Sequence, residues 1–207
     1  MTPHSIRRGT IVLLAALCLG RGANAVPPQT LSLQPESAIW LVGDSTLHAF
    51  TCLSKQFQVT AEADAPGTEA ILQRNALKRL DVVVPVKTLQ SKESALDKNM
   101  YKAMKAEQYP EILFRLATYE ISASTTGASA SHVKANGTLT IAGHEQPVVL
   151  EGEILPGMAG FRVQGQYKLR MSDYGIKPPT MMMGTIRVKD DVVVHFDLQL
   201  QAPATVQ

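Results

Sequence analysis

Residues 43–47 have the sequence Gly-Asp-Ser-Thr-Leu, and Ser45 in this stretch is the residue best suited to act as a nucleophile. A serine hydroxyl attacks a substrate when an adjacent base accepts its proton. The later residues that could supply such a base are Asp191 and His195, which are four positions apart. Hydrolysis through Ser45 is therefore one hypothesis for this stretch, and a polar turn between two strands is the other.

The letters Gly-Asp-Ser resemble the serine block of the GDSL hydrolases, in which the serine is the nucleophile. That resemblance implies a later Asp-x-x-His pair and an α/β sheet with flanking helices. Asp191 and His195 have one residue too many between them, and the chain contains no G-x-S-x-G or H-E-x-x-H motif. We therefore expect no catalytic residues and no enzymatic activity, with a hydrolase that uses Ser45 as the least favoured alternative.

The candidate metal ligands are His48, Cys52, His144, His195 and a run of Met residues. If residues 47–52 form a strand, His48 and Cys52 share a face but lie about 13 Å apart, which is too far for one ion. Three consecutive Met side chains in an extended chain also cannot all point at one ion. We expect a structural role for each histidine and no metal site, with copper binding through Met and His as the weaker alternative.

Two groups of Met residues carry a different signal. Met100 and Met104 lie one helical turn apart, while Met171 and residues 181–183 flank an apolar but irregular segment that contains Tyr174. Unbranched thioether side chains fill irregular space and repack around flexible partners. Ordinary core packing and a ligand-lining role both fit these side chains, although four Met on one loop are more than a tightly specified core usually carries.

Apolar and polar residues alternate with period two along most of the chain, which predicts β-strands with one buried face. Strands of this kind are typical of antiparallel sheet. We expect about eight strands, and the candidate ranges are 38–42, 47–52, 57–62, 80–86, 112–119, 133–141, 148–154, 161–170 and 192–200. A turn from Gly143 to Pro147 joins two of these strands. Residues 26–34 are expected to form a short extended leader, and residues 202–207 a frayed tail.

One helix is predicted from Ala95 to about Ala106. Ser94 is placed to cap its N-terminus, and Asp97, three residues later, is placed to return the bond as in a capping box. The helix has one apolar stripe, which consists of Leu96, Met100, Ala103 and Met104. An antiparallel chain with one helix closes as a barrel or stacks as a sandwich, and the period alone does not choose between them.

The N-terminus has the pattern of a cleavable signal peptide from Met1 to Ala25. Arg7 and Arg8 precede an apolar run from Ile11 to Leu19, and Ala23-Asn24-Ala25 is the small-x-small motif that signal peptidase cleaves. The apolar run is about half of the roughly 20 residues that span a bilayer, and no later segment approaches that length. We expect a periplasmic or secreted protein with one domain, residues 26–207, and no transmembrane segment.

Removal of the signal peptide changes the charge and the thiol content. The whole chain has 20 Lys and Arg against 18 Asp and Glu; without the three Arg of the signal the count is 17 against 18, a net charge of about −1. A near-neutral chain without a basic run has no electrostatic basis for binding nucleic acid. Cys52 becomes the only cysteine, and it is either a buried apolar thiol or one that is reactive or paired between subunits, so a homodimer is left open.

A set of motifs in fixed order resembles the YceI-like family. The motifs are Leu80–Val86, Ser91–Asp97, Tyr109-Pro110 leading to Phe114, Gly137–Gly143 with Pro147, Ser172–Ile176 and Val192–Leu200. They cover nearly the whole chain after the signal peptide. The resemblance implies a lipocalin-like antiparallel β-barrel with the helix between strands, an elongated apolar cavity for a polyisoprenoid or another long-chain lipid, a periplasmic or secreted location, and no catalytic residues.

We therefore predict an exported all-β barrel that binds a long apolar lipid, such as a polyisoprenoid or an isoprenoid quinone, for transport or storage, without any other cofactor. The candidate ligand-binding residues are Phe50, Met100, Met104, Phe114, Leu116, Leu139, Ile141, Val163, Tyr167, Met171, Tyr174, Met182 and Phe196. Periodicity does not distinguish a hollow barrel from a filled one. The alternative is a binding module with a filled barrel that acts through a protein partner or in a stress response.

Overall fold

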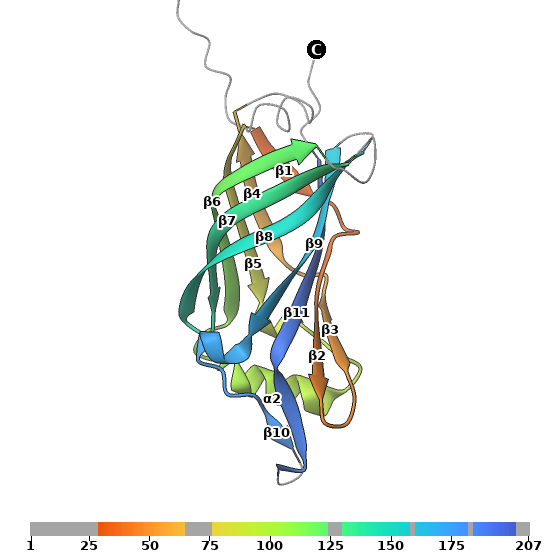
Figure 1. Cartoon of the computed structure of the whole chain (residues 1–207), viewed down its shortest axis with the longest axis vertical. Coiled ribbons are helices and arrows are strands. Elements are labelled where there is room, and N and C mark those ends of the chain that lie inside the picture. Colours follow the sequence, from red (N-terminus) through yellow and green to blue (C-terminus); the bar gives the residue numbers. More distant parts are fainter. Residues whose placement is uncertain (1–28, 65–75, 124–129, 158–159, 182–183, 202–207) are drawn as a thin grey trace, which may run out of the picture.

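The computed structural model describes residues 29–64, 76–123, 130–157, 160–181 and 184–201 (Figure 1). The expected signal peptide with its cleavage site at Ala25, the expected frayed tail and the candidate residue Met182 lie outside these ranges.

Eight antiparallel strands close into a barrel. In order around the ring they are β1 (Gln29–Leu33), β4 (Gln58–Ala63), β5 (Leu77–Pro85), β6 (Glu111–Ala123), β7 (Ser131–Ile141), β8 (His144–Pro156), β9 (Gly160–Arg170) and β11 (Ile186–Gln201). β1 pairs with both β4 and β11, which closes the ring. The expected all-β, lipocalin-like antiparallel barrel of about eight strands is confirmed.

Three further strands continue the sheet along β11 where β1 no longer pairs with it. β2 (Ala38–Ser45) pairs with β11 from Asp197 to Val188, and β3 (Phe50–Ser54) pairs with β2. β10 (Thr180–Met181) pairs with the start of β11. β11 therefore contacts β1 only at its last residues, Leu200 and Gln201, and β2 over most of its length.

The two ends of the barrel differ, as Figure 1 shows. We call the end at which β1 pairs with β11 the closed end. Helix α2 (Ser94–Ala103) lies across the opposite end, which we call the helix end. Two 3-10 turns, η1 (Val86–Thr88) and η2 (Met171–Tyr174), complete the described elements.

Helix α2 is shorter than predicted, and its first turn is capped differently. Ser94 is already helical, and Glu93 occupies the N-cap position without a side-chain cap bond. The Asp97 carboxylate accepts a hydrogen bond from the backbone N–H of Ser91 at 2.8 Å, not from that of Ser94. The predicted capping box is therefore wrong, because the loop before the helix curls back so that Ser91 reaches the carboxylate first.

The helix ends in a Schellman motif centred on Lys105, which has a φ of 52°. The Ala106 N–H donates to the Tyr101 carbonyl at 2.9 Å, and the Lys105 N–H donates to the Lys102 carbonyl at 3.1 Å. The chain thus leaves the helix after Ala103 although apolar residues continue to Ala106. The single predicted helix is present, and its apolar stripe faces the barrel interior.

Two segments have a different role from the one predicted. Gln29–Leu33, expected to be part of an extended leader, is strand β1 of the barrel. Thr46–Ala49 forms the turn between β2 and β3, so the strand predicted at residues 47–52 begins at Phe50 instead. Ser45 holds this turn, because its hydroxyl donates to the His48 carbonyl at 2.8 Å.

The turn predicted from Gly143 to Pro147 is also wrong. Only Ala142 and Gly143 turn, both with positive φ, as the tightest hairpins require. β8 starts at His144, and Pro147 lies inside it opposite Thr138 of β7. Proline donates no backbone hydrogen bond and is therefore confined to strand positions that lack a neighbour on one side. β8 has no partner on its β9 side at Pro147, since β8 and β9 pair only from Glu151 onward.

Candidate functional site

An apolar cavity of about 280 Å³ occupies the interior of the barrel. Among the described residues that line it, none is Asp, Glu, Lys, Arg or His, and Asn99 contributes the only side-chain amide. A buried water needs two to four polar partners, and the described lining offers few such groups. The site therefore favours an apolar occupant.

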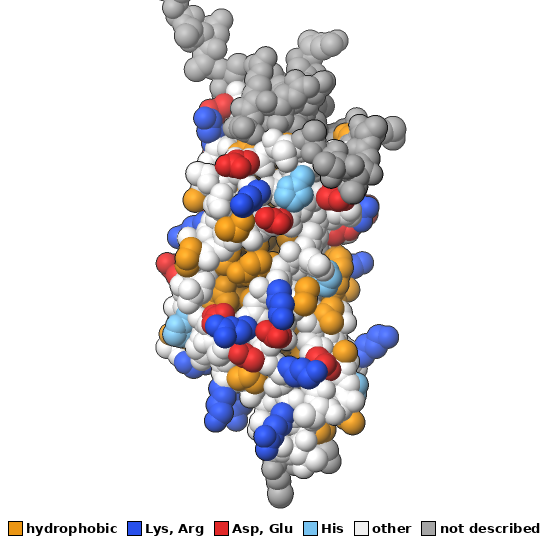
Figure 2. All heavy atoms as spheres, in the orientation of Figure 1, with side chains coloured by type: hydrophobic (Ala, Val, Ile, Leu, Met, Phe, Trp, Pro, Cys, Tyr) orange, Lys and Arg blue, Asp and Glu red, His pale blue; other side chains and the backbone are white. Residues whose placement is uncertain are grey.

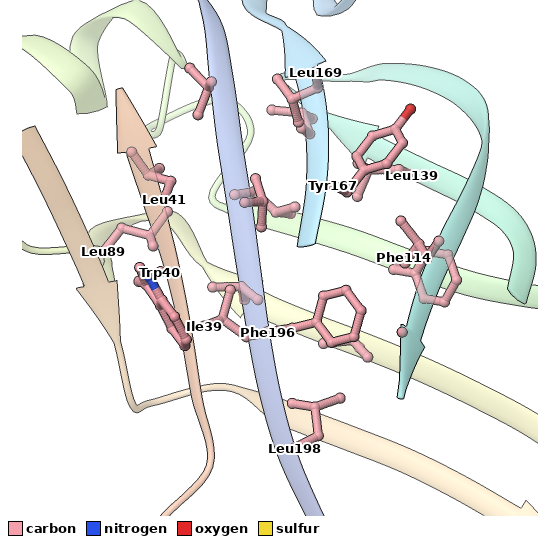
Figure 3. Close-up of a pocket in the computed structure, with 18 of the residues that line it drawn as sticks. Ile39, Trp40, Leu41, Leu89, Phe114, Leu139, Tyr167, Leu169, Phe196 and Leu198 are labelled. Atoms are coloured by element: carbon pink, nitrogen blue, oxygen red, sulfur yellow. The ribbon is translucent and has the colours of Figure 1, made fainter. Parts of the chain in front are cut away.

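The period-two pattern of the strands builds the wall. Along β11, Val192, Val194, Phe196 and Leu198 line the cavity, whereas the residues between them face outward or sideways. Figure 3 shows Phe196 and Leu198 of β11 and Tyr167 of β9 directed into the same space as Phe114 of β6. The apolar faces of the strands therefore line a tube.

Three phenylalanine rings lie close to glycines on neighbouring strands, in space that a Cβ atom would otherwise occupy. A Cβ atom at Gly165 would lie 2.5 Å from the Phe196 ring, and one at Gly137 would lie 2.6 Å from the Phe114 ring. A Cβ atom at Gly43 would lie 2.8 and 2.9 Å from two ring atoms of Phe50. Any larger residue at these glycines would push the rings toward the lumen.

Eleven of the thirteen candidate ligand-binding residues line this cavity. They are Phe50, Met100, Met104, Phe114, Leu116, Leu139, Ile141, Val163, Tyr167, Met171 and Phe196. Tyr174 does not line it; this side chain is 2% exposed and packs under η2 with Leu169 and Ile176. Met182 lies outside the described residues. That the eleven side chains contact a ligand remains a prediction.

Sequence reasoning missed several cavity residues. Ile39 and Leu41 alternate within the predicted strand at residues 38–42 and could have been found by the period used for the other strands. Leu89 follows η1 in a loop and carries no periodic signal. Asn99 of α2 was not a candidate, yet it borders the cavity beside Met100.

The barrel wall parts between β8 and β9 toward the helix end. β8 and β9 pair from Glu151–Gln166 to Pro156–Phe161, but below that point β8 continues with β7 and β9 continues with β11. We call the unpaired stretch, residues 146–150 of β8 and 167–170 of β9, the seam. Turn η2 partly fills the seam, and the Gln146 amide donates to the Asp173 carbonyl at 2.8 Å.

The seam exposes apolar surface. Figure 2 shows hydrophobic side chains in a hollow at the height at which β8 and β9 separate in Figure 1. Val149, on the seam edge of β8, is 42% exposed. Charged residues surround the hollow, which places apolar surface next to a polar rim.

Among the described residues, the Ser45 hydroxyl donates to a backbone carbonyl and not to a side-chain base. Its hydroxyl accepts hydrogen bonds from the N–H groups of Leu47 and His48, each at 3.2 Å, as expected of a turn. His195 pairs with Trp40, five residues from Ser45 along β2, which corresponds to roughly 17 Å at the rise of a strand. The His195 ring stacks on Trp40 with centroids 5.0 Å apart. Of the two hypotheses for this stretch, the geometry matches the polar turn.

Cys52 is a buried thiol. It is 0% exposed, and burial, followed by the charge of Asp97, raises its pKa to about 12. His48 is exposed and lies 3.7 Å from the Glu93 carboxylate, so it does not share a site with Cys52. In the ranges that the structure describes, no three His, Cys, Asp or Glu side chains gather as around a metal ion. The same ranges contain no helix with the length and hydrophobicity needed to cross a membrane.

The fold and the cavity together define a class: antiparallel β-barrels that enclose one apolar cavity, as lipocalins do. A family comparison then identifies the chain within this class. The profile of the YceI-like domain matches residues 39–200, and the chain belongs to this family. No significant match was found among curated protein sequences.

Solved structures support the fold. The crystal structure of BcnA from Burkholderia cenocepacia is similar with a TM-score of 0.64 at 16% identity, over 81% of this chain and 99% of that one. A polyisoprenoid-binding domain from Saccharophagus degradans has a TM-score of 0.60 at 13% identity, over 84% and 98%. A YceI protein from Campylobacter jejuni has a TM-score of 0.53 at 21% identity, over 70% and 81%. At these identities the likeness shows the fold.

Proposed function

We propose that this protein is exported and binds one long apolar lipid, a polyisoprenoid or an isoprenoid quinone, in the barrel cavity for transport or storage. The observation that carries the proposal is the cavity itself, which has a volume of about 280 Å³ and no charged residue among the described residues that line it. Membership in the YceI-like family supports it, as does the structural likeness to a polyisoprenoid-binding domain.

The energetics suit a prenyl chain. An isoprene unit has five carbons, so at roughly 0.8 kcal/mol per buried CH₂ each unit hidden from water contributes a few kcal/mol. The measured affinity will be smaller than the sum, because immobilisation and ordering oppose binding. A chain of several units is nearly insoluble alone, so a protein that shields it between membranes serves either transport or storage.

The same cavity argues against the filled-barrel alternative. A barrel that acts only as a scaffold for a protein partner needs no glycines under its inward aromatic rings, yet Gly43, Gly137 and Gly165 all leave room there. Hydrolysis through Ser45 gains no support from a hydroxyl engaged in the β2–β3 turn.

Mass spectrometry of bound lipid tests the proposal directly. The full chain would be expressed in a Gram-negative bacterium, purified without detergent and extracted with organic solvent. We expect one dominant class of prenyl lipid in the extract at a substantial molar fraction of the protein. An extract without lipid, together with no binding of added prenyl compounds, would refute the proposal.

A matched pair of variants on β7 tests the placement of the ligand. Ala135 lines the cavity, whereas Lys134 is exposed on the outer face. Ala135→Phe should fill the lumen and lower the co-purified lipid at least several-fold, while Lys134→Phe should leave it unchanged. Equal lipid content in the two variants would place the ligand elsewhere.

Export has its own measurement. Cell fractionation should find the protein outside the inner membrane, and intact-mass analysis should find a mature chain that begins at Val26. A cytoplasmic chain that retains Met1 would refute export and leave the cavity proposal standing.

A further inference from the structure

Helix α2 and the turn that ends it carry three exposed lysines. Lys98, Lys102 and Lys105 are four and three residues apart, which is the spacing of neighbours on one face of a helix. Met100 and Met104 of the same segment line the cavity instead. Among the described residues, the three lysines form no ion pair. We call them the lysine row.

The charges of the lysine row are not compensated within the helix. The only carboxylate of α2, Asp97, already accepts the Ser91 N–H at 2.8 Å. Like charges three or four residues apart on a helix repel one another. The helix dipole offsets this repulsion for Lys102 in the last turn, but not for Lys98 near the middle of the helix. Elsewhere in the described ranges, seven cations do pair with a carboxylate: Lys78, Arg79, Lys87, Arg162, Lys168, Arg170 and Lys189. The lysine row therefore favours an anionic partner outside the chain.

An exposed leucine lies at the same end of the molecule. Leu47, in the turn between β2 and β3, is 65% exposed, more than any other large hydrophobic residue that the structure describes. This turn lies beside the start of α2, as Figure 1 shows, because the His48 imidazole is 3.7 Å from the Glu93 carboxylate. The first N–H of the turn also donates to the Arg187 carbonyl of β11 at 2.9 Å. Leu47 thus projects from the end of the barrel that carries the lysine row.

Two further cations extend the basic surface across this end. Lys177, shortly before β10, and Arg187, near the start of β11, are both exposed. Neither forms an ion pair within the described part of the chain. The Asp44 carboxylate is neutralised by Lys189 at 2.6 Å. On the face that Figure 2 shows, the lowest part of the molecule has blue side chains and no red ones. The surface around Leu47 is therefore basic.

A basic surface with a projecting apolar side chain fits an anionic phospholipid bilayer. Interfacial binding combines cations that attract anionic head groups with apolar side chains that enter the acyl boundary. A bilayer presents phosphates over its whole area, so cations on separate elements can all find a partner. An acidic protein would need carboxylates at matching positions and would leave Leu47 without a role. Each Lys or Arg near an anionic bilayer strengthens binding about fivefold.

We propose that the helix end docks on an anionic phospholipid bilayer, with the lysine row and Arg187 on the head groups and Leu47 inserted between them. The docking surface is separate from the cavity, since none of these side chains lines it. The inference thus goes beyond the proposed function: it adds the surface at which the protein meets a membrane. Docking there would bring the cover of the cavity, α2, next to the bilayer.

Vesicle sedimentation of the intact purified protein tests the proposal. The vesicles consist of phosphatidylcholine alone or of phosphatidylcholine with an equal amount of phosphatidylglycerol. The wild type should bind the anionic vesicles at least tenfold more tightly than the neutral ones at low salt. The preference should shrink as the salt concentration rises to about 0.15 M, because screening weakens attraction between exposed charges.

Matched variants test the lysine row. Lys98→Gln/Lys102→Gln/Lys105→Gln should weaken binding to anionic vesicles at least tenfold. Lys78→Gln/Arg115→Gln/Lys134→Gln removes the same charge from exposed positions of the barrel wall and should change binding less than twofold. Circular dichroism melting checks that both variants are folded.

A second matched pair tests insertion of the leucine. Leu47→Ser should weaken binding to anionic vesicles several-fold, because the serine loses the apolar contact with the acyl boundary. Leu53→Ser changes a leucine that is 40% exposed on β3, outside the cavity and away from the turn, and should leave binding unchanged. Soluble polyaspartate serves as the comparison for a protein-like polyanion and should bind the wild type more weakly than the anionic vesicles.

The outcomes separate docking from lipid binding in the cavity. Equal binding to neutral and anionic vesicles, or equal losses in the lysine-row variant and the wall variant, would refute docking. Polyaspartate binding as tight as vesicle binding, with no effect of Leu47→Ser, would show a surface for acidic chains and would also refute it. The lipid that co-purifies with the lysine-row variant should match that of the wild type. Failure of the proposed function would appear in that extract, whereas failure of docking would appear only with vesicles.

Discussion

The closed end and the helix end of the barrel are made of the same alternating strands and border the same cavity, yet the closed end has a complete ring with a packed cluster at its rim, whereas the wall of the helix end is parted. At the closed end, Leu31 of β1 packs against Ala61 and Ala63 of β4, and these three side chains are at most 2% exposed. At the helix end, β8 and β9 separate, and α2 and η2 cover the space that a complete wall would close.

The difference shows that alternation alone does not decide how tightly each end of a barrel is packed. Small residues and a complete hydrogen-bonded ring let side chains from opposite walls meet at the closed end. At the helix end the wall is parted at the seam, and the Phe50 and Phe114 rings occupy the space beside glycines. Stability and binding are therefore expected to reside in different halves of the molecule.

A leucine pair tests this division most strongly. Leu31→Ala should lower the free energy of unfolding by about 3 kcal/mol, because it leaves a void in a packed cluster. Leu139→Ala should lower it by only about 1 kcal/mol, because Leu139 faces open space and has fewer partner atoms to lose. Urea denaturation of delipidated protein measures both values.

Lipid binding should show the reverse order. Leu139→Ala should change the affinity for a prenyl chain, whereas Leu31→Ala, outside the cavity, should not. Equal losses of stability in the two variants would mean that the helix end is as tightly packed as the closed end.

The sequence predicts the inward faces well, and for a physical reason. Wherever a strand is buried on one side only, as along Val192 to Leu200, period-two alternation indicates which side chains face the interior. The apolar stripe of α2 was predicted equally well, since Met100 and Met104 are one helical turn apart. These local patterns located most candidate cavity residues.

Features that depend on pairing between distant strands were not predictable. A polar turn near Ser45 was one hypothesis, but its position at Thr46–Ala49 was not predicted, because these residues alternate like a strand. β9 alternates without interruption through Leu169, so its sequence does not indicate that its pairing with β8 ends at the seam. Tyr174 was predicted to contact the ligand because its loop is apolar. In the structure its side chain packs within the wall instead.

A substitution beneath the Phe50 ring should fill part of the cavity at the helix end. Gly43→Ala places a methyl group against the Phe50 ring and should push that ring into the lumen. We expect the affinity for a prenyl chain to fall several-fold and the free energy of unfolding to fall by about 1–2 kcal/mol. Adding Phe50→Leu should restore much of the stability, and a double-mutant cycle measures this coupling. Additive effects would show that the methyl group acts elsewhere.

The smallest expected effect concerns pH and belongs to Cys52, which packs beneath α2. Its pKa rises from about 9 in the unfolded chain to about 12 in the fold, because burial disfavours the thiolate. The neutral thiol therefore contributes its full stability below pH 9, and this contribution is lost as the pH rises from 9 toward 12. Between pH 9 and pH 10 the loss should be about 1 kcal/mol.

Urea denaturation at pH 8, 9 and 10 measures this slope, and Cys52→Ala is the matched variant. The variant should be less stable at pH 8, because it leaves a small void, but its stability should fall less between pH 9 and pH 10. Thiol reagents at pH 8 should modify the wild type only at the rate of unfolding, since Cys52 is 0% exposed. Rapid modification of the folded protein would mean that the wall beneath α2 opens as readily as the seam.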